Sequence, residues 1–503
     1  MFILHWMIRF ITFSALISDE CMVIVLKDYD LIVIGTGSVL ETVNAMEREN
    51  PRMRLAVIDK DEPGGICLTR GCIPSKILLY PAELVRTIET ASDFGISVDM
   101  KNVDFQAVMQ RMRSLISADI SGMRRGLTHT KNLDYYKDVA EFVAPYTLKV
   151  GKETIKSKMI FLCTGSKPVI PPIEGLENVK YHTSDTILKL DRLPKSMAVI
   201  GGGYIAAEYG HFFSAMGSEV TIIGRNRQFI PEEEPEVSAL AKRELQKHIT
   251  IMTDHEVHSV KNGAEGKKKL DAVNRQTGKD VEITAEEILV ASGRGPNTDI
   301  LHPEKAGIRT DEKGWIIVNE YLETSQPNVW ALGDADGRYL FKHVANYEAL
   351  IVYYNAVQKR GIKADYHAVP HAVFTSPEIA SVGLKEKEAV EKYGKSNLLI
   401  GVQRYEDTAK GLAMGVKDYF VKVIFESTTL KILGAHIIGP YASVLIQEII
   451  NLMYTPTQSA EPLIEGMHIH PALSEVVQRA VAFRMPVDQY HHMMEEHYGL
   501  RAE

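Results

Sequence analysis

Two segments of this chain run from a short apolar strand into a glycine-rich turn and then into a helix. Residues 28–37 (DYDLIVIGTG) form the first, with another apolar strand at 55–59 (LAVID). Residues 196–203 (SMAVIGGG) form the second, with another strand at 219–223 (EVTII). Uninterrupted Ile, Val and Leu runs are typical of parallel strands covered on both faces. A strand, a helix and a strand in succession favour an α/β architecture. The sequence therefore predicts two nucleotide-binding lobes in one chain.

The composition is that of a globular protein with several cores. The chain has 503 residues, of which 45% are hydrophobic and 24% are charged. The formal net charge is -8, and Lys and Arg are scattered, so we expect no nucleic-acid partner, which would need a basic face. Four cysteines are too few for a secreted disulfide scaffold and suit a reducing compartment. We therefore expect a cytoplasmic protein.

The first 17 residues (MFILHWMIRFITFSALI) are apolar but are interrupted by His5 and Arg9. The run is short for a membrane span, which needs ~20 apolar residues, and a signal peptide usually opens with positive charge. We expect the functional chain to begin near Met22, with residues 1–21 a leader that is disordered or not native. A genuine signal or anchor is the alternative. No later run is long and apolar enough to cross a bilayer, so we expect no membrane partner.

The first glycine turn contains Gly35 and Gly37. Glycines permit a tight turn and let backbone N–H groups approach a diphosphate at the helix N-terminus. Asp59 lies about 20 residues later, where an acidic residue binds a ribose hydroxyl. Leu40 occupies the third small position of the pattern and is expected to push the helix and strand apart. A plain strand-to-helix turn is therefore the alternative.

The second glycine turn, with Gly201 and Gly203, keeps a small residue at that third position and predicts a dinucleotide site. Where an NAD-binding unit places an acid, this chain has Gly224, followed by Arg225 and Arg227. An acid would repel a 2′-phosphate, whereas an arginine pairs with it. The pattern favours NADP over NAD; two solvated surface arginines are the alternative.

The most specific motif is residues 64–76 (GGICLTRGCIPSK), in which four residues separate Cys67 from Cys72. Pro74 suits the opening turn of a helix that starts near Cys72. A thiol at a helix N-terminus has a lowered pKa, because its thiolate faces the positive end of the helix dipole. The motif predicts a redox-active pair that can close a reducible disulfide. Two buried thiols or half of a zinc site are the alternatives, and no second Cys/His pair lies nearby to complete a metal site.

Residues 470–475 (HPALSE) place His470 and Glu475 five positions apart. The two can form a hydrogen-bonded base and its orienting carboxylate if the chain turns there. With 17 histidines in the chain, a surface histidine is the alternative.

Taken together, these motifs resemble the class I flavoprotein disulfide reductases, a family that includes dihydrolipoamide dehydrogenase, glutathione reductase and mercuric reductase. The resemblance runs from about Tyr29 to Ala480, with the motifs in family order. Besides the segments above, it rests on FLCTG (161–165), LVASGRGPNT (289–298), VWALGD (329–334), HVA (343–345), FTSPEIASVGL (374–384) and LGAHIIGP (433–440).

The resemblance implies an α/β fold with two Rossmann-like nucleotide-binding domains, one for FAD and one for NAD(P), and a C-terminal α+β dimerisation domain. We expect a leader at 1–21, an FAD-binding domain at 22–167 that is completed by 294–365, an NAD(P)-binding domain at 168–293 and a dimerisation domain at 366–503.

The resemblance also implies the roles of the site residues. Cys67 exchanges with the substrate sulfur, Cys72 faces the flavin, His470 is the acid–base catalyst and Glu475 orients it, the last two coming from the other subunit of a homodimer. The FAD site is expected at Gly35, Gly37, Asp59, Lys76, Gly165, Gly333 and Asp334. The NAD(P) site is expected at Gly201, Gly203, Tyr204, Glu208, Arg225 and Gly293. No metal site is expected.

The expected substrate is a small-molecule or lipoyl-domain disulfide or dithiol. The HPALSE form and the absence of extra cysteines favour dihydrolipoyl dehydrogenase. Mercuric reductase is the second choice, although the segment 485–503 lacks the cysteine pair usual in that enzyme. A non-catalytic flavin-binding paralogue that acts as a structural partner is the alternative of another class, and Leu40 favours it.

Overall fold

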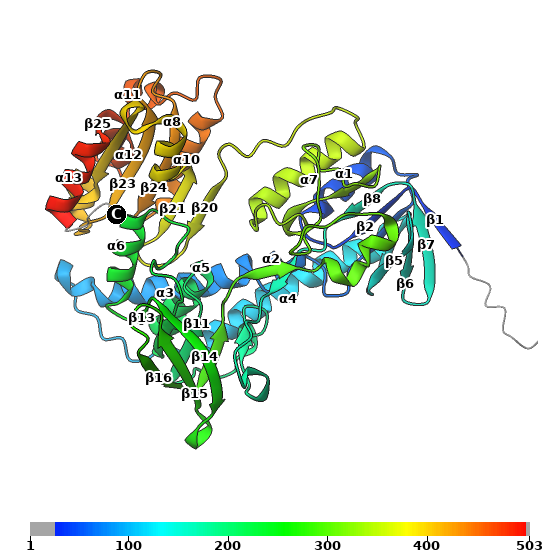
Figure 1. Cartoon of the computed structure of the whole chain (residues 1–503), viewed down its shortest axis with the longest axis horizontal. Helices are drawn as coiled ribbons and strands as arrows, with labels where there is room; N and C mark the ends of the chain where they lie inside the picture. The colour runs from blue at the N-terminus through cyan, green and yellow to red at the C-terminus, as the bar shows by residue number, and fades with distance from the viewer. Residues whose placement is uncertain (1–25, 499–503) are drawn as a thin grey trace, which may run out of the picture.

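A five-stranded parallel sheet is the centre of the first lobe, at the right of Figure 1. The computed structural model describes residues 26–498; the predicted leader, residues 1–21, lies outside the described residues. The strand order is β19-β8-β2-β3-β4, and all neighbours are parallel. The sheet comprises β2 (Leu31–Ile34), β3 (Leu55–Ile58), β4 (Leu133–Tyr136), β8 (Ile160–Leu162) and β19 (Val329–Ala331). β19 follows the second lobe in the chain, so the first lobe is built from two separate segments.

The strand predicted within residues 28–37 is divided between two strands, β1 and β2, instead of being one. β1 (Leu26–Tyr29) belongs to a separate four-stranded sheet, in the order β1-β7-β6-β5. The break falls at Asp30, whose carboxylate accepts a hydrogen bond from the Arg54 amide at 2.8 Å. The partners of β1 are β5 (Ala140–Ala144), β6 (Thr147–Val150) and β7 (Glu153–Ser157).

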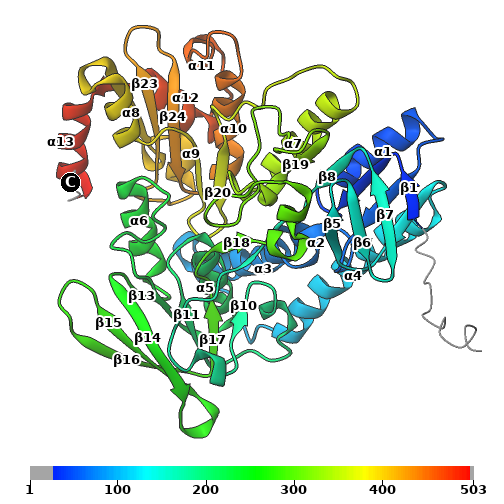
Figure 2. The same cartoon turned by 45° about the vertical axis from the view of Figure 1, so that its right-hand side comes forward.

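The second lobe, at the lower centre of Figure 1, repeats this design. Its five-stranded parallel sheet has the order β10-β17-β11-β12-β13. A three-stranded antiparallel sheet, β14-β15-β16, lies at its side (Figure 2). The strands are β10 (His182–Thr183), β11 (Ser196–Ile200), β12 (Glu219–Ile223), β13 (Thr250–Met252), β14 (His255–Asn262), β15 (Lys268–Asn274), β16 (Asp280–Ala285) and β17 (Glu287–Val290). A two-stranded sheet of β9 (Ser166–Pro168) and β18 (Arg294–Pro296) marks the two crossings between the lobes.

The third lobe, at the upper left of Figures 1 and 2, is a six-stranded antiparallel sheet flanked by helices. The strand order is β20-β21-β24-β23-β22-β25. The strands are β20 (Pro370–Val373), β21 (Ile379–Gly383), β22 (Leu398–Arg404), β23 (Phe420–Glu426), β24 (Ile432–Ile438) and β25 (Arg484–Pro486). Two Rossmann-like lobes and an α+β lobe confirm the predicted fold class.

Helices connect and cover these sheets. Those of the first two lobes are α1 (Val39–Glu49), α2 (Gly65–Thr69), α3 (Cys72–Glu89), α4 (Phe105–His129), α5 (Tyr204–Met216), α6 (Pro235–Leu245) and α7 (Lys342–Ala356). Those of the third are α8 (Glu386–Tyr393), α9 (Ala409–Ala413), α10 (Ala442–Met453), α11 (Glu461–Glu465), α12 (Ser474–Ala482) and α13 (Val487–Tyr498). Helix α3 packs against α5 and so joins the first lobe to the second. Within residues 26–498, no helix combines the length and the apolar character that a membrane span requires.

Candidate active site

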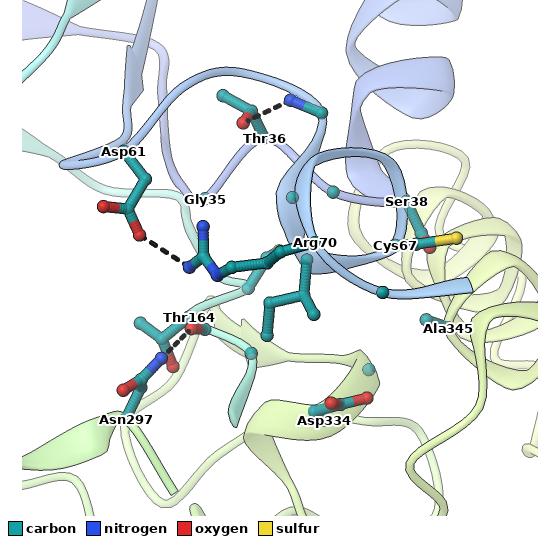
Figure 3. A pocket seen from close by; sticks show the side chains of 18 of the residues that line it. Gly35, Thr36, Ser38, Asp61, Cys67, Arg70, Thr164, Asn297, Asp334 and Ala345 are labelled. Carbon is teal, nitrogen blue, oxygen red and sulfur yellow. Dashed lines mark hydrogen bonds and ion pairs between the residues drawn. The ribbon is translucent and has the colours of Figure 1, made fainter. Parts of the chain in front are cut away.

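A cavity of about 1530 Å³, including its open mouth, lies where the first lobe meets the start of α3 and the start of α5. Figure 3 shows part of its lining. It brings together residues that were predicted from separate motifs: Gly35, Gly37, Asp59, Cys67, Cys72, Lys76, Gly165, Tyr204, Glu208, Gly333 and Asp334. The other predicted residues do not line it: Gly201, Gly203, Arg225, Gly293, His470 and Glu475. The cysteine pair and the first glycine turn therefore share one site.

The first glycine turn is held closely against its surroundings. Gly35 has φ 109°, and a Cβ at this position would lie 2.1 Å from the carbonyl oxygen of Cys163, so glycine is required. The hydroxyl of Thr36 donates to Asp59 at 2.5 Å and accepts from the Gly64 amide at 3.0 Å (Figure 3). Burial raises the pKa of the Asp59 carboxyl, although the Thr36 hydroxyl opposes this. Asp59, predicted to bind ribose, also fixes the turn.

Leu40 does not lie at the centre of the packed face of its helix. The buried positions of α1 are Val39, Thr42, Val43 and Met46, which follow helical spacing. Leu40 is half-buried at the margin of this face and packs against the same hydrophobic cluster. It is also not among the residues that line the cavity. The bulky residue at the third position therefore leaves the cavity side of the turn open.

The two cysteines lie on consecutive helices. Cys67 is in α2 and is half-buried, whereas Cys72 is the first residue of α3 and is exposed. The Cys67 thiol is hydrogen-bonded to Cys72, and this bond, with help from the Lys76 charge, lowers the pKa of Cys72 to about 7. The same bond, together with burial, raises the pKa of Cys67. Both shifts favour Cys72 as the thiolate of the reduced pair, at the positive end of the helix dipole.

Lys76, expected in the FAD site, and Glu208, expected in the NAD(P) site, form an ion pair with each other. Lys76 Nζ lies 2.9 Å and 2.8 Å from the two carboxylate oxygens of Glu208. The backbone amide of Phe374 donates to the same carboxylate at 3.1 Å, and the Phe374 ring lies 4.7 Å from Lys76 Nζ. Tyr204, where burial raises the pKa to about 12, also lines the cavity. The second lobe thus contributes directly to the wall behind Cys72.

Sequence reasoning missed three charged residues that shape the cavity. Arg70 lies between Cys67 and Cys72 in the sequence. It forms an ion pair with Asp61 at 2.7 Å (Figure 3) and another with Asp185 at 3.1 Å. Arg294 and Lys342 also line the cavity. Arg70 and Arg294 lie inside the motifs GGICLTRGCIPSK and LVASGRGPNT, so a charged residue within each motif was an available signal. Lys342 had no local signal, because its contacts are made with residues far away in the sequence.

The second glycine turn is also constrained by its neighbours. Gly201 has φ 136°, and a Cβ would lie 2.2 Å from the Ala291 carbonyl oxygen. A Cβ on Gly224 would lie 3.2 Å from Gly202 Cα, so the end of β12 abuts the turn. A Cβ on Gly203 would meet nothing within 4 Å. The backbone therefore has room for a ligand at the start of α5, where helix N–H groups favour a phosphate.

Three arginines lie near the end of β12: two follow it in the sequence, and the third comes from the β15–β16 turn. Arg225 and Arg227 are exposed. The guanidinium of Arg275, at the β15–β16 turn, donates to the Arg225 carbonyl at 2.9 Å. The antiparallel sheet of the second lobe thereby supports the segment that replaces the acidic residue of an NAD site.

His470 and Glu475 form a hydrogen-bonded pair on the third lobe. His470 Nδ1 lies 2.9 Å and 3.1 Å from the two Glu475 oxygens, and Arg479 donates to Glu475 at 3.4 Å. The His470 side chain is 65% exposed. Within one chain, this pair is not brought to the cavity that contains Cys67. A single chain therefore does not place this base beside its own cysteines.

The residues present fit a dinucleotide in each Rossmann-like lobe. A Cβ on Gly37 would meet nothing within 4 Å, so this part of the first turn, like Gly203 in the second, can be approached closely by a ligand. Two such lobes converging on a thiol pair define a nucleotide-linked dithiol oxidoreductase. Residues 29–388 match the pyridine nucleotide-disulphide oxidoreductase family and residues 369–481 match its dimerisation domain, so the chain belongs to that family. The family is FAD-dependent and uses a pyridine nucleotide.

Several named relatives cover nearly the whole chain. Mycothione reductase of Mycobacterium tuberculosis is 35% identical over 91% of this chain and 99% of its own length. Dihydrolipoyl dehydrogenase of Synechocystis is 33% identical over 90% of this chain and 98% of its own length. Mercuric reductase of Staphylococcus aureus is 32% identical over 83% of this chain and 76% of its own length. Among solved structures, a Cu(II) complex of the HOCl-induced flavoprotein disulfide reductase RclA of Escherichia coli aligns with a TM-score of 0.80 at 25% identity, covering 91% and 99% of the two chains.

Proposed function

We propose that this protein is an FAD-dependent reductase that uses NADPH to reduce a small disulfide through Cys67 and Cys72. The observation that carries the proposal is the position of Cys72 at the start of α3, with Cys67 hydrogen-bonded to it and the Lys76–Glu208 pair reaching in from the second lobe. The arginines after β12 support NADPH as the nucleotide, because they suit a 2′-phosphate. We also propose that the protein is cytoplasmic, because so few cysteines suit a reducing compartment.

The order of the thiol steps is the one that the family resemblance implies, with Cys67 as the thiol that exchanges with substrate and Cys72 as the thiol that faces the flavin. Cys67 loses its proton and attacks one sulfur of the substrate disulfide; this forms a mixed disulfide and expels the first substrate thiolate. The Cys72 thiolate then attacks Cys67, closes the Cys67–Cys72 disulfide and expels the second thiolate. The substrate is reduced to two thiols and the cysteine pair is oxidised. FAD, when bound, carries the electron pair from the nicotinamide that restores the dithiol.

The proton transfers require an acid–base group close to Cys67. The pKa of Cys67 is raised by its hydrogen bond to Cys72 and by burial, so the attacking sulfur needs help to ionise. His470 is exposed, and the Glu475 carboxylate holds its Nδ1, which leaves Nε2 for proton transfer. We propose that His470 of a second copy enters the mouth of the cavity and that the enzyme is a homodimer with shared sites.

Dihydrolipoyl dehydrogenase activity is the second candidate. The HPALSE form of the histidine motif and the lack of further cysteines in 485–503 favour it, and one named relative carries that activity in its name. The direction of electron flow separates the two functions, since a dehydrogenase reduces NAD with dihydrolipoamide, whereas a reductase oxidises NADPH with a disulfide.

Steady-state kinetics on the full-length protein test the proposal. NADPH and NADH are each paired with glutathione disulfide, mycothiol disulfide, lipoamide and Hg(II), and the reverse reaction is run with dihydrolipoamide and NAD or NADP. We expect a yellow protein that turns over a disulfide with NADPH and loses this turnover in Cys67→Ser while keeping its flavin. Faster turnover with dihydrolipoamide and NAD would establish the dehydrogenase instead. A colourless, inactive protein would support a non-catalytic paralogue.

A further inference from the structure

Lys342 is a cation of the large cavity without an acidic partner. It is the first residue of α7, is half-buried, and donates from Nζ to the Ser38 hydroxyl at 2.9 Å. Within the described part of the chain, no carboxylate oxygen lies within 4.0 Å of this Nζ. The other cations of the lining are paired: Lys60 with Asp61 (2.9 Å), Arg70 with Asp61 (2.7 Å), Lys76 with Glu208 (2.8 Å) and Arg294 with Asp185 (3.7 Å).

The surroundings of Lys342 are themselves positive. Helix α7 begins at Lys342, and the ammonium group contacts Ser38, directly before the N-terminus of α1, where the helix dipole is positive. Ala345, in the first turn of α7, also lines the cavity (Figure 3). The Asp334 carboxylate accepts a hydrogen bond from another residue, Ser166, at 2.5 Å. An anion bound beside this ammonium group would be stabilised by its charge.

We propose that Lys342 binds the diphosphate of FAD, as a side-chain cation added to the first glycine turn. This inference rests on the cavity binding FAD. Ser38 makes no capping bond to α1; instead its hydroxyl accepts from Lys342, so the ammonium is held against the turn. A Cβ on Gly37 would meet nothing within 4 Å, which leaves the adjoining backbone accessible to a phosphate.

This role accounts for the departure of the turn from the dinucleotide pattern. Leu40 replaces the third small residue, and the turn is therefore the weaker of the two glycine turns by sequence. A lysine acts on phosphate as a point charge, and a hydrogen bond between ionised partners is roughly twice as strong as one between neutral groups. Lys342 would thus offset an imperfect backbone cradle with charge.

An alternative role for Lys342 in the same cavity is to stabilise Cys67 as a thiolate when this residue loses its proton during the reaction. The Lys342 charge lowers the pKa of Cys67, against the larger effects of the Cys72 hydrogen bond and burial. If this alternative were the role of Lys342, removing its charge would change the reactivity of the Cys67 thiol and leave FAD affinity unchanged. The two roles are separable because riboflavin lacks a diphosphate, whereas FAD contains one.

The test compares wild type with Lys342→Met, which keeps the length of the side chain and removes its charge. FAD affinity is measured on the full-length holoprotein by equilibrium dilution, with released FAD followed by fluorescence. Riboflavin affinity is measured by titration of the flavin-stripped full-length chain. We expect Lys342→Met to weaken FAD binding at least about tenfold, which corresponds to ~1.4 kcal/mol, and to leave riboflavin binding unchanged. Added salt should weaken FAD binding to wild type more than to the variant.

Two further variants control the result. Lys342→Arg keeps the charge and should retain most of the FAD affinity. Lys363→Met removes an exposed lysine that is paired with Glu320 at 2.8 Å in the same lobe, and it should bind FAD as wild type does. Unchanged FAD affinity in Lys342→Met, or equal loss of FAD and riboflavin, would overturn the proposal; unchanged affinity with slower alkylation of Cys67 would assign Lys342 to the thiolate. A wild-type chain that binds no FAD would instead refute the proposed function.

Discussion

The Nδ1 atom of His470 lies 2.9 Å from Glu475 Oε1, yet neither residue lines the cavity that contains Cys67. The Ala472 amide also donates to Glu475, at 3.3 Å, so the carboxylate is fixed by the turn that precedes α12. A carboxylate held in this way sets the tautomer and the orientation of the imidazole. The exposed imidazole is therefore held in one orientation, which is what its proposed role in the site of a second copy requires.

Replacing the members of this pair should slow proton transfer without affecting cofactor binding. General acid–base catalysis contributes about 10²–10⁴-fold, so His470→Gln should lower kcat for disulfide turnover by about 100-fold or more. Glu475→Gln should cause a smaller loss, because the ring remains but loses its orienting charge. Reduction of the cysteine pair by NADPH should be nearly unchanged in both variants. Stopped-flow absorbance separates this step from steady-state turnover.

Mixed dimers test whether the base comes from the partner chain. Cys67→Ser and His470→Gln dimers are each inactive if the sites are shared. A hybrid dimer of the two combines one intact cysteine pair with the intact His470 of its partner, and so has one working site. Activity should appear after subunit exchange. Inactive hybrids, shown to have formed by mass spectrometry, would contradict shared sites.

The Cys72 thiolate should titrate near neutral pH. Its pKa is lowered to about 7 by the hydrogen bond from Cys67 and by the Lys76 charge. Thiolate absorbance at Cys72 in the reduced protein should therefore rise through pH ~7 and reach a plateau well below the ordinary range of a free cysteine. Cys67→Ala removes the donor and should move this titration to higher pH. Ultraviolet titration, with alkylation mapped by mass spectrometry, measures both.

Replacing the two members of the Lys76–Glu208 ion pair should shift the pKa of Cys72 in opposite directions. Lys76→Met removes a cation and should raise the pKa of Cys72, whereas Glu208→Gln removes an anion and should lower it. Shifts in the same direction in both variants would indicate distortion of α3 rather than electrostatics.

The two glycine turns and the thiol at the start of α3 could be predicted from the sequence because each depends on local rules. Gly35 and Gly201 have positive φ, and Cys72 begins a helix, as the motifs required. The strand break at Asp30 was missed, because an apolar run does not show which sheet each half joins. Lys342 was missed for a different reason: its partner Ser38 lies 304 residues away, and no local pattern encodes such a contact.

Arg225 should determine the choice of nucleotide. An ionic hydrogen bond to phosphate contributes ~1.5–3 kcal/mol, so Arg225→Gln should raise KM for NADPH by about tenfold or more and leave KM for NADH nearly unchanged. Arg192→Gln, which removes an exposed arginine elsewhere in the second lobe, is the matched control and should change neither value. Equal effects on both nucleotides, or a wild type that strongly prefers NADH, would contradict the assignment.

Lys422 links the second lobe to the third from a fully buried position. Its Nζ lies 2.6 Å from Glu236 at the start of α6 and 2.8 Å from Glu386 at the start of α8. Tyr490 of α13 donates to Glu236 at 2.6 Å, so the C-terminal helix closes the same network. This contact gives α13 a structural role, because it ties the helix to the ion-pair network between the two lobes.

Removing this cation should destabilise the protein without touching the active site. Lys422→Met removes the cation that Glu234, Glu236 and Glu386 share, leaving His491 as the remaining partner of Glu386. Breaking a buried ion pair in this way costs about 3–5 kcal/mol. Chemical unfolding followed by circular dichroism should show a clearly lower midpoint, while Lys363→Met, at an exposed pair, should unfold like wild type. Adding Glu236→Gln to Lys422→Met should recover part of the loss, because one uncompensated charge is removed. If Lys422→Met unfolded at the wild-type midpoint, the network would not hold the two lobes together.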